Sequence, residues 1–202
     1  MKKLSRDFYN RDSVLVAQEL LGKILVHKIN GGVLKAKIVE TEAYMGIVDK
    51  AAHSHNRKKT PRIEVMYGDP GFSYVYLIYG IYNCFNVVAS ERNNPHAVLI
   101  RAIEPIEGIE LMSVNRYKKD FKDLSKKEIL GLGNGPGKLC MSLSIDRNLN
   151  GEDLRGDRLW IEDNKEVFNI VTSKRIGIGY AEEAIHFPYR YYIDGNPYVS
   201  RK

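Results

Sequence analysis

Hydrophobic and polar positions in the first fifth of the chain predict a helix followed by a β-hairpin. Apolar residues recur with helical spacing after Asp12, a residue that caps helix N-termini, and Gly22 follows the last of them. Strand-like stretches then cover residues 23–29 and 33–44, on either side of Asn30-Gly31-Gly32. Because glycine and asparagine tolerate positive backbone angles, these stretches are expected to pair across a tight turn.

The rest of the chain predicts more strands, one more helix and a long loop. Residues 45–71 combine turn signals with charged side chains and are expected to form a functional loop. Strand character returns over 72–89 and 97–102, a helix is expected over 105–117, and 118–127 has the composition of a charged connector. Weaker strand signals lie at 158–161, 175–179 and 189–194.

Antiparallel hairpins dominate this pattern, and no internal repeat or low-complexity tract interrupts it. The sequence therefore predicts an α+β fold, with a mainly antiparallel or mixed sheet and surrounding helices. At 202 residues and 44% hydrophobic, the chain can bury a sizeable core, and we expect one domain over residues 1–202.

The strand predicted over 33–44 carries acidic residues where its own alternation predicts core. Positions 34, 36 and 38 are Leu, Ala and Ile, and Glu40, Glu42 and Tyr44 continue at every second residue. Side chains alternate across a strand, so these three are expected on the same inward face. A buried unpaired carboxylate is unstable, which predicts a basic partner, a polar pocket with water, or a role in catalysis.

Charge and cysteine content narrow the possible partners and location. Lys and Arg total 31 against 25 Asp and Glu, and the net charge of +6 favours an anionic partner such as nucleic acid, although it equally fits an ordinary basic protein. The only cysteines, Cys84 and Cys140, provide neither a disulfide framework nor a Cys-x-x-Cys site, which fits a reducing compartment. The opening residues lack the apolar run of a signal peptide, and residues 74–88 are too interrupted by polar residues to predict a membrane segment.

Aromatic residues are concentrated between residues 72 and 88. Tyr79 precedes Gly80, so a turn there would push the tyrosine outward, where it is suited to wedging into stacked DNA. Tyr44, His53 and Tyr76 could line a slot for a flat ring, although each aromatic taken alone fits a β-sheet core better. The aromatic residues of this segment are Phe72, Tyr74, Tyr76, Tyr79, Tyr82 and Phe85.

Several linked motifs give the chain a resemblance to a known family. In order and approximate spacing, the chain resembles the alkyladenine (3-methyladenine) DNA glycosylase family from about Phe8 to Ser200. The motifs that carry the resemblance are Glu40-Thr-Glu-Ala-Tyr44, Ala51-Ala-His-Ser54, Thr60-Pro-Arg62, Tyr74-Val-Tyr-Leu-Ile-Tyr-Gly80, Cys84-Phe-Asn86, Leu99-Ile-Arg-Ala-Ile-Glu-Pro105 and Gly135-Pro-Gly-Lys-Leu-Cys140.

The resemblance implies a base-excision repair enzyme that flips a damaged purine out of double-stranded DNA and hydrolyses its N-glycosidic bond. Glu42 matches the general base that activates water, and Arg101 matches a residue that holds the water and the flipped nucleotide. Residues matching the base-binding pocket are Tyr44, His53, Tyr76 and Asn86, with Asn86 matching the residue that excludes normal guanine. Tyr79 matches the wedge that fills the gap in DNA, and Lys138 matches a lysine that contacts the DNA backbone.

The chemistry of these residue types agrees with those roles. Glycosidic cleavage develops positive charge on the sugar. A carboxylate can stabilise this charge, and it can also take a proton from the water that attacks the sugar. The expected substrates are alkylated or deaminated purines, namely 3-methyladenine, 7-methylguanine, hypoxanthine and ethenoadenine. Lys138 is expected to meet phosphate rather than form a Schiff base, so we expect a monofunctional enzyme that leaves an abasic site. The alternative for Glu42 is a core ion pair with Arg101 and no catalysis.

Two other classes of function are compatible with parts of the sequence. Glu40, Glu42, Asp49, His53 and His55 have ligand types of a metal-dependent nuclease or phosphatase, but no second cluster completes such a site, and no metal or cofactor is expected. A non-enzymatic nucleic-acid binder would explain the charge and the tyrosines but not the acidic strand.

The segment Gly133-Asn-Gly-Pro-Gly-Lys138 resembles a nucleotide-binding loop only superficially. Leu132 occupies the position of the first P-loop glycine, and Leu139 replaces the Ser or Thr that would bind magnesium, so the segment is expected to be a turn that meets DNA phosphate. We expect the protein to act as a monomer, and to lie in the cytoplasm and nucleoid, or in the nucleus of a eukaryote.

Overall fold

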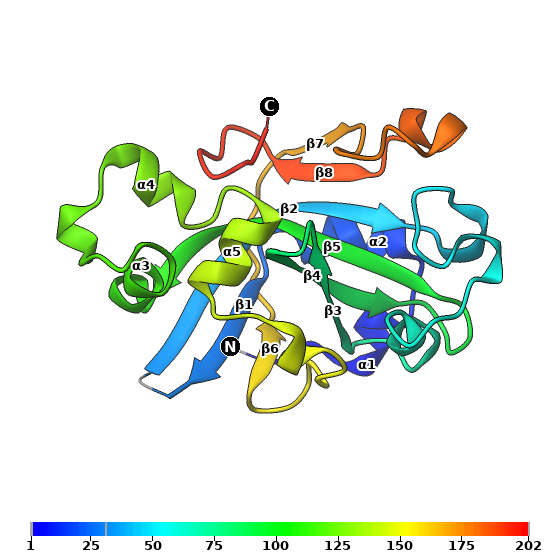
Figure 1. Ribbon diagram of the computed structural model, residues 1–202, viewed down its shortest axis with the longest axis horizontal. Helices are drawn as coiled ribbons and strands as arrows, with labels where there is room; N and C mark the ends of the chain where they lie inside the picture. The colour runs from blue at the N-terminus through cyan, green and yellow to red at the C-terminus, as the bar shows by residue number, and fades with distance from the viewer. Residues whose placement is uncertain (1, 31, 202) are drawn as a thin grey trace.

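The computed structural model describes residues 2–30 and 32–201, and a strongly curled antiparallel sheet forms its centre (Figure 1). The strand order is β3-β4-β5-β2-β1-β6, and β8 pairs with both β2 and β7. All the pairings are antiparallel, which confirms the predicted α+β class and sheet type. The strands are β1 (Ile24–Ile29), β2 (Gly32–Tyr44), β3 (Ser73–Ile78), β4 (Tyr82–Ala89), β5 (His96–Glu107), β6 (Leu159–Glu162), β7 (Ile170–Ser173) and β8 (Arg190–Ile193).

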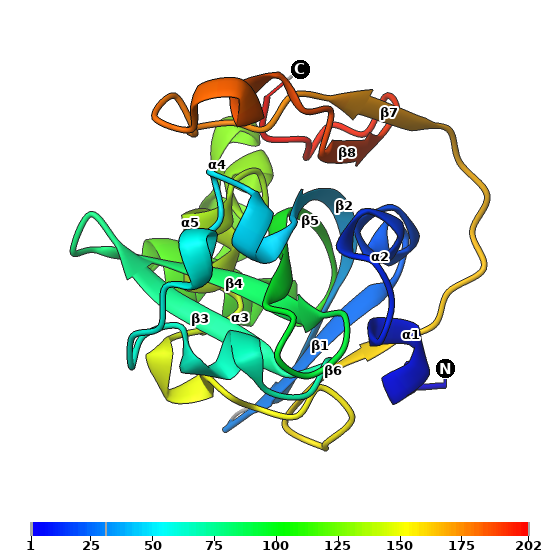
Figure 2. The ribbon, with the colours of Figure 1, turned by 90° about the vertical axis from the view of Figure 1, so that its right-hand side faces the viewer.

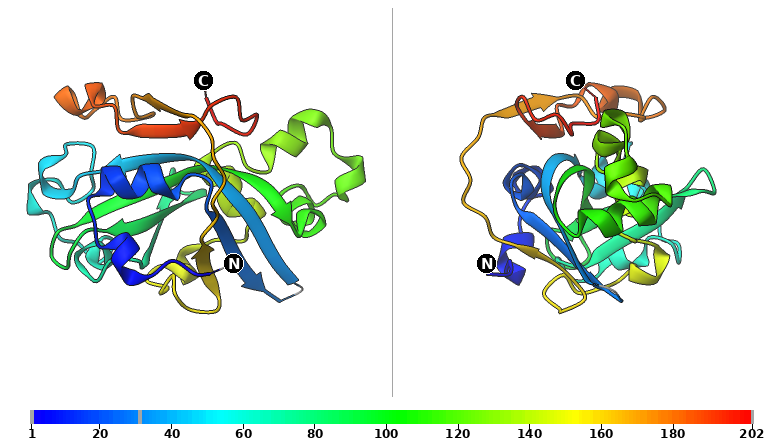
Figure 3. Two further views of the ribbon diagram at one scale, coloured as in Figure 1. Left: turned by 180° about the vertical axis from the view of Figure 1, so that it is seen from behind. Right: turned by 90° about the vertical axis from the view of Figure 1, so that its left-hand side faces the viewer.

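Helices cover the sheet from opposite sides. Helix α2 packs on β2 and β5, and α5 packs on β4 and β5. In Figure 1, α5 lies in front of the sheet, and the rear view of Figure 3 brings α2 to the front. The main hydrophobic core contains residues of α2, α5 and all the central strands. The helices are α1 (Arg6–Tyr9), α2 (Ser13–Leu20), α3 (Ile109–Tyr117), α4 (Lys126–Gly131) and α5 (Pro136–Ser142).

The predicted helix and hairpin at the start of the chain are confirmed. Asp12 Oδ1 accepts a hydrogen bond from the Val14 N–H at 2.8 Å, which caps α2, and Gly22 ends the helical segment with a φ of 78°. Strands β1 and β2 pair from Ile24 opposite Lys37 to Ile29 opposite Gly32. Of the predicted turn, Gly31 lies outside the described residues.

A β-bulge in β2 decides which way the acidic residues face. The pairing of β2 with β5 shifts between Ile38 and Glu40, and Val39 joins Ile38 in the hydrophobic core. One extra residue reverses the alternation beyond it, so Ala43 returns to the core while Glu40 and Glu42 point to the other face. The prediction that the acids are buried is confirmed, but the prediction that they share the face of residues 34, 36 and 38 is wrong.

Four predicted elements differ in the structure: three have other bounds, and one is not a strand. Strand β5 continues to Glu107, so the helix predicted over 105–117 begins only at Ile109. In the described chain, β4 pairs only with residues 96–99 of β5. Pro105 lies beyond this pairing, so the strand tolerates it because no hydrogen bond to β4 is lost where proline lacks an N–H. The strand expected over 72–89 is a hairpin of β3 and β4, and the strand expected over 175–179 is an irregular segment that follows β7.

Three short helices were not predicted, and the first of them, α1, precedes the expected helix after Asp12. Ser125 and Glu128 form a capping box that starts α4 inside the expected connector, and Pro136 occupies the first turn of α5, where a turn alone was expected. Residues 45–71 do form a long loop, with short 3-10 turns at Gly46–Val48, His55–Arg57 and Glu64–Tyr67. No helix within 2–30 and 32–201 is both long enough and apolar enough to cross a membrane.

The last part of the chain covers the sheet face that carries the acids. The segment between β6 and β7, yellow to orange in Figure 2, runs along the outside of the molecule to reach β7. Strand β8 then pairs with β2 along Glu40–Glu42, with Arg190 opposite Glu42. This arrangement places charged groups from distant parts of the sequence around the two carboxylates.

Candidate active site

Glu42 is fully buried, and its carboxylate is held by three groups. Its Oε1 accepts a hydrogen bond from the Ile176 N–H at 2.8 Å and lies 3.3 Å from Arg101 Nη1. Its Oε2 accepts from the Tyr44 hydroxyl at 2.8 Å. A carboxylate has about four acceptor positions, so Glu42 keeps capacity to accept a hydrogen bond from water.

Burial raises the pKa of Glu42 above its usual value, and Arg101, the Ile176 N–H and the Tyr44 hydroxyl oppose that shift. The result is a carboxylate more basic than an exposed one. A general base works best when its pKa approaches the working pH, so this environment suits Glu42 to accepting a proton.

An aromatic cavity of about 40 Å³ lies beside Glu42. Tyr44 connects the two, because its ring lines the cavity and its hydroxyl donates to the carboxylate. The lining residues are Tyr44, Ala51, His53, Met66, Tyr74, Tyr76, Asn86, Ala97 and Tyr180.

His53, Tyr74 and Tyr76 form one wall of the cavity. His53 Nδ1 lies 2.8 Å from the Tyr74 hydroxyl, and the imidazole meets the Tyr76 ring edge-to-face with centroids 4.7 Å apart. The Arg62 guanidinium covers Tyr76 at 4.8 Å. Asn86, almost fully buried on β4, donates from Nδ2 to the Tyr74 carbonyl at 3.0 Å. These contacts fix the orientation of the rings before any ligand binds.

The His53 imidazole is expected to stay neutral throughout the physiological pH range. Burial, with help from the positive charges of Arg62 and Lys58, lowers its pKa to about 4. In an NMR titration, the His53 ring signals should therefore stay constant between about pH 8 and 5 and shift only under more acidic conditions. A His53 midpoint near 6.5 would contradict this description of the cavity.

Tyr79 and Lys138 lie outside the cavity. Tyr79 occupies the turn between β3 and β4, which projects from the body of the molecule at the left of Figure 2; its φ is 53° and its side chain is 83% exposed. Lys138 lies in the first turn of α5, and its Nζ donates to Asn134 Oδ1 at 2.8 Å. The structure thus brings together Glu42, Arg101, Tyr44, His53, Tyr76 and Asn86, and places the two predicted DNA contacts elsewhere on the protein.

Sequence analysis missed the segment around residues 175–180. Ile176 donates to Glu42, and Tyr180 lines the cavity with a ring that is 66% exposed. The preceding Arg175 lies over the Tyr44 ring at 4.8 Å and is paired with Asp49. Gly177 and Gly179 were a signal of irregular backbone, and Gly177 has a φ of 77°, but nothing local indicated that the segment reaches β2.

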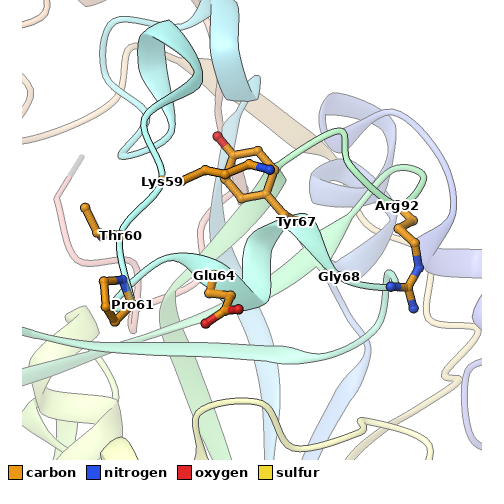
Figure 4. Close-up of a pocket in the computed structure, with 7 residues that line it drawn as sticks. All are labelled: Lys59, Thr60, Pro61, Glu64, Tyr67, Gly68 and Arg92. Carbon is orange, nitrogen blue, oxygen red and sulfur yellow. The ribbon is translucent and has the colours of Figure 1, made fainter.

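A larger hollow of about 550 Å³ lies on the outer side of the 59–68 segment (Figure 4). Lys59 lies over the Tyr67 ring at 4.7 Å, and Arg92 is held by Asp69 in a bidentate pair at 2.8 and 2.9 Å. Met66, from the same short turn as Tyr67, faces the aromatic cavity instead. The hollow is separate from Glu42 and contains none of the predicted catalytic or base-binding residues.

The residues considered for a metal site are engaged elsewhere. Asp49 binds Arg175, His55 Nδ1 lies 3.1 Å from the Ile47 carbonyl, and His53 faces Tyr74. Within residues 2–30 and 32–201, no three His, Cys, Asp or Glu side chains are grouped so as to hold a metal ion. Cys84 and Cys140 are buried free thiols.

Comparison with known proteins identifies the family. The model of the methylpurine-DNA glycosylase family matches residues 7–197. The chain belongs to this family. Over its full length it is 62% identical to a protein of Desulfitobacterium hafniense strain Y51, with both chains covered completely. It is 55% identical to a protein of Alkaliphilus oremlandii (99% of this chain, 100% of the relative) and 56% identical to one of Clostridium acetobutylicum (98% and 97%). All three relatives are named "Putative 3-methyladenine DNA glycosylase".

Family membership confirms the resemblance seen in the motifs. As a methylpurine-DNA glycosylase, the protein is an N-glycosyl hydrolase of DNA repair.

Proposed function

We propose that this methylpurine-DNA glycosylase removes 3-methyladenine and related alkylated or deaminated purines from double-stranded DNA, with Glu42 as its catalytic base. The single observation that carries the proposal is the hydrogen bond from Tyr44 to Glu42, which joins the aromatic cavity to the buried carboxylate. The names of the full-length relatives support the substrate class.

In the proposed reaction, Glu42 takes a proton from a water that attacks the sugar carbon as the base departs. The raised pKa of Glu42 favours proton transfer, and its negative charge stabilises the positive charge that develops on the sugar. Arg101, at 3.3 Å, limits the rise of that pKa and so keeps a useful fraction of Glu42 ionised.

The cavity would bind the flipped base by stacking. Purines methylated at N3 or N7 carry a positive charge and stack well on electron-rich rings such as Tyr44 and Tyr76. A neutral His53 would not repel a cationic base, in contrast to an imidazolium. Asn86 is held by the Tyr74 carbonyl, so its rigid side chain would clash with the 2-amino group of normal guanine.

The proposed enzyme is monofunctional. A glycosylase that also cleaves the strand needs an amine nucleophile desolvated beside the sugar. Lysine is absent from the residues that line the cavity in the described chain, and Lys138 of α5 donates to Asn134, which precedes that helix. We propose that Lys138 contacts a DNA phosphate and that the protein acts as a monomer, since the proposed groups all come from one chain.

Base release from defined DNA duplexes tests this function. Duplexes with a single 7-methylguanine, 3-methyladenine, hypoxanthine or ethenoadenine would be incubated with the protein in EDTA, and released base and strand cleavage measured separately. We expect release of free base and an abasic strand that breaks only after alkali. Lack of release from every duplex would overturn the proposal, and trapping of a protein–DNA adduct by borohydride would overturn the monofunctional mechanism.

Tyr79→Ala is expected to weaken excision without weakening the fold. Because the ring is 83% exposed, its removal creates no cavity in the core, and thermal unfolding should stay unchanged. If the ring fills the gap left by the flipped nucleotide, the variant loses about 1–3 kcal/mol of stacking. Binding to a duplex with a stable abasic analogue measures this loss. Val167→Ala is the control, because it removes another exposed apolar side chain, in the segment between β6 and β7. The wedge role is contradicted if Tyr79→Ala binds that duplex as tightly as the wild type.

A further inference from the structure

Glu40 is a second fully buried carboxylate, and the reaction proposed above gives it no role. Its Oε1 accepts from Arg101 Nε at 3.1 Å, Arg190 Nε at 2.7 Å and the Ser200 hydroxyl at 3.0 Å. Its Oε2 accepts from the Ser200 N–H at 2.7 Å. A group with this many charge-assisted partners is held in one position.

Arg101 is shared between the two glutamates. Its Nε bonds Glu40, its Nη1 lies 3.3 Å from Glu42, and its Nη2 donates to the Ser200 hydroxyl at 3.4 Å. Because a guanidinium is planar, fixing the Nε edge and Nη2 also fixes where Nη1 points. The contact with Glu42 is the longer of the two carboxylate contacts, 3.3 Å against 3.1 Å for Glu40.

Glu40 is also held by a residue of β8, the strand that pairs with β2. Arg190 of β8 bonds Glu40 through Nε, and through its Nη2 it also donates to the Arg201 carbonyl. The 196–201 segment thereby closes over Glu40, and its Ser200 hydroxyl contacts both Glu40 and Arg101. The chain of contacts runs from this segment through Glu40 to Arg101 and ends at Glu42.

We infer that Glu40 is a positioning residue, which orients the Arg101 guanidinium toward Glu42 so that Arg101 can hold the catalytic carboxylate and the nucleotide. The inference rests on the proposed role of Glu42 in base excision. Glu40 touches neither the cavity nor, in the proposed reaction, the substrate; it acts through Arg101.

Glu40 also contributes a charge that Glu42 senses. The charged and titratable groups facing Glu42 are Arg101 of β5, Tyr44 and Glu40 of β2, Arg175 and Tyr180 of the 175–180 segment, and Cys84 of β4. Among these, Glu40 raises the pKa of Glu42 and Arg101 lowers it, and Arg101 has the larger effect. If Glu40→Gln releases Arg101 from Glu42, the pKa of Glu42 should therefore rise, whereas removal of the Glu40 charge with Arg101 still in place would lower it.

Glu40→Gln is the test, measured as single-turnover excision of 7-methylguanine across a range of pH. This base is already cationic, so the acidic limb of the profile reports deprotonation of Glu42 rather than protonation of the leaving group. We expect the rate to fall about 10- to 100-fold, because a displaced group near the reacting atoms has effects of that size. We also expect the acidic limb to move to higher pH, because a displaced Arg101 no longer lowers the pKa of Glu42. An unchanged rate, or a lower rate with an acidic limb that stays in place or moves to lower pH, would overturn the inference.

Glu104→Gln is the matched control. Glu104 lies on the same strand as Arg101 and accepts from Asn196 Nδ2 at 2.9 Å. It therefore tethers the 196–201 segment without contacting Arg101 or Glu42. This variant should keep the wild-type rate and pH profile. If it reproduces the Glu40→Gln effects, loosening of the 196–201 segment explains them and the positioning role fails.

Ser200→Ala keeps the inference testable if Glu40→Gln does not fold. The substitution removes the hydroxyl that bridges Glu40 and Arg101 and leaves the Ser200 N–H bond to Glu40 in place. Loss of one such hydrogen bond predicts a rate lower by about 2- to 10-fold. A wild-type rate in Ser200→Ala would overturn the inference. Wild-type protein that releases no base would instead overturn the proposed function, so the two failures are distinguishable.

Discussion

Glu42→Gln is expected to lower the single-turnover rate of base excision by about 10²- to 10⁴-fold, the usual contribution of a general base. Glutamine has the size of glutamate and can still accept the Ile176 N–H through its oxygen, but its amide cannot take a proton from water. The rate should be measured on a duplex that the wild type processes, with enzyme in excess over DNA.

Binding and folding of Glu42→Gln separate catalysis from structure. Affinity for a duplex with an uncleaved damaged base should stay close to that of the wild type, because the aromatic lining of the cavity is unchanged. Arg101 keeps Glu40 as an ionic partner, so the variant leaves no buried arginine without a carboxylate. If this variant excises the base at the wild-type rate, Glu42 has no catalytic role and is only part of a core ion pair with Arg101.

Asp49→Asn is expected to destabilise the protein by about 3–5 kcal/mol, the usual effect of breaking a buried ion pair. Asp49 and Arg175 are 1% and 0% exposed, with contacts of 2.5 and 2.9 Å between their charged groups. For a domain of this size the loss corresponds to a melting temperature lower by about 6–20 °C. Denaturant and thermal unfolding of the two proteins measure it.

Lys50→Ala provides the control for Asp49→Asn. Lys50 is the next residue in the chain, and it pairs with Glu182 and Glu183 on the surface. Ion pairs exposed to solvent contribute little to folding stability, so this variant should have the same unfolding curves as the wild type. Equal unfolding curves for Asp49→Asn and the wild type would show that Arg175 finds adequate partners without the carboxylate.

The pH dependence of the Asp49 effect has a defined sign. Burial acts to raise the pKa of Asp49, but its bonds to Arg175 and to the Met45 and Ala51 N–H groups outweigh burial and lower it. A carboxyl with a lowered folded-state pKa stabilises the protein above its unfolded pKa of about 3.9 and loses that effect as pH falls through the folded value. The difference between wild type and Asp49→Asn should therefore be full near neutral pH and shrink below about pH 4.

Much of the site was predictable because its residues carry local signals. Acids in a strand that otherwise alternates indicated that Glu40 and Glu42 are buried, and a tyrosine before Gly80 indicated an exposed turn. The family motifs then grouped Tyr44, His53 and Tyr76, which the structure places around one cavity. In each of these cases, the pattern and the contact lie within a few residues of each other, or within one motif.

The remainder of the site depends on contacts between distant segments. Ile176 reaches Glu42 across more than half of the chain, and Arg190 and Ser200 reach Glu40 from farther still. Ile176 contributes only a backbone N–H, which any residue other than proline supplies, so its side chain contains no signal. The face of Glu40 was mispredicted for a related reason, since Val39 is an ordinary strand residue and the bulge is set by pairing with β5.

The bulge at Val39 makes the length of β2 a requirement for the enzyme. Deleting one residue between Gly32 and Glu40 at constant pairing would turn both carboxylates toward the apolar side of the sheet, where Val98 and Ile100 lie, and would move Thr41 and Ala43 into contact with the arginines. Many apolar residues could replace Val39, but insertions and deletions in this stretch should be excluded from functional homologues. Among such proteins, alignment gaps are therefore expected in the surface loops and not between the start of β2 and its second glutamate.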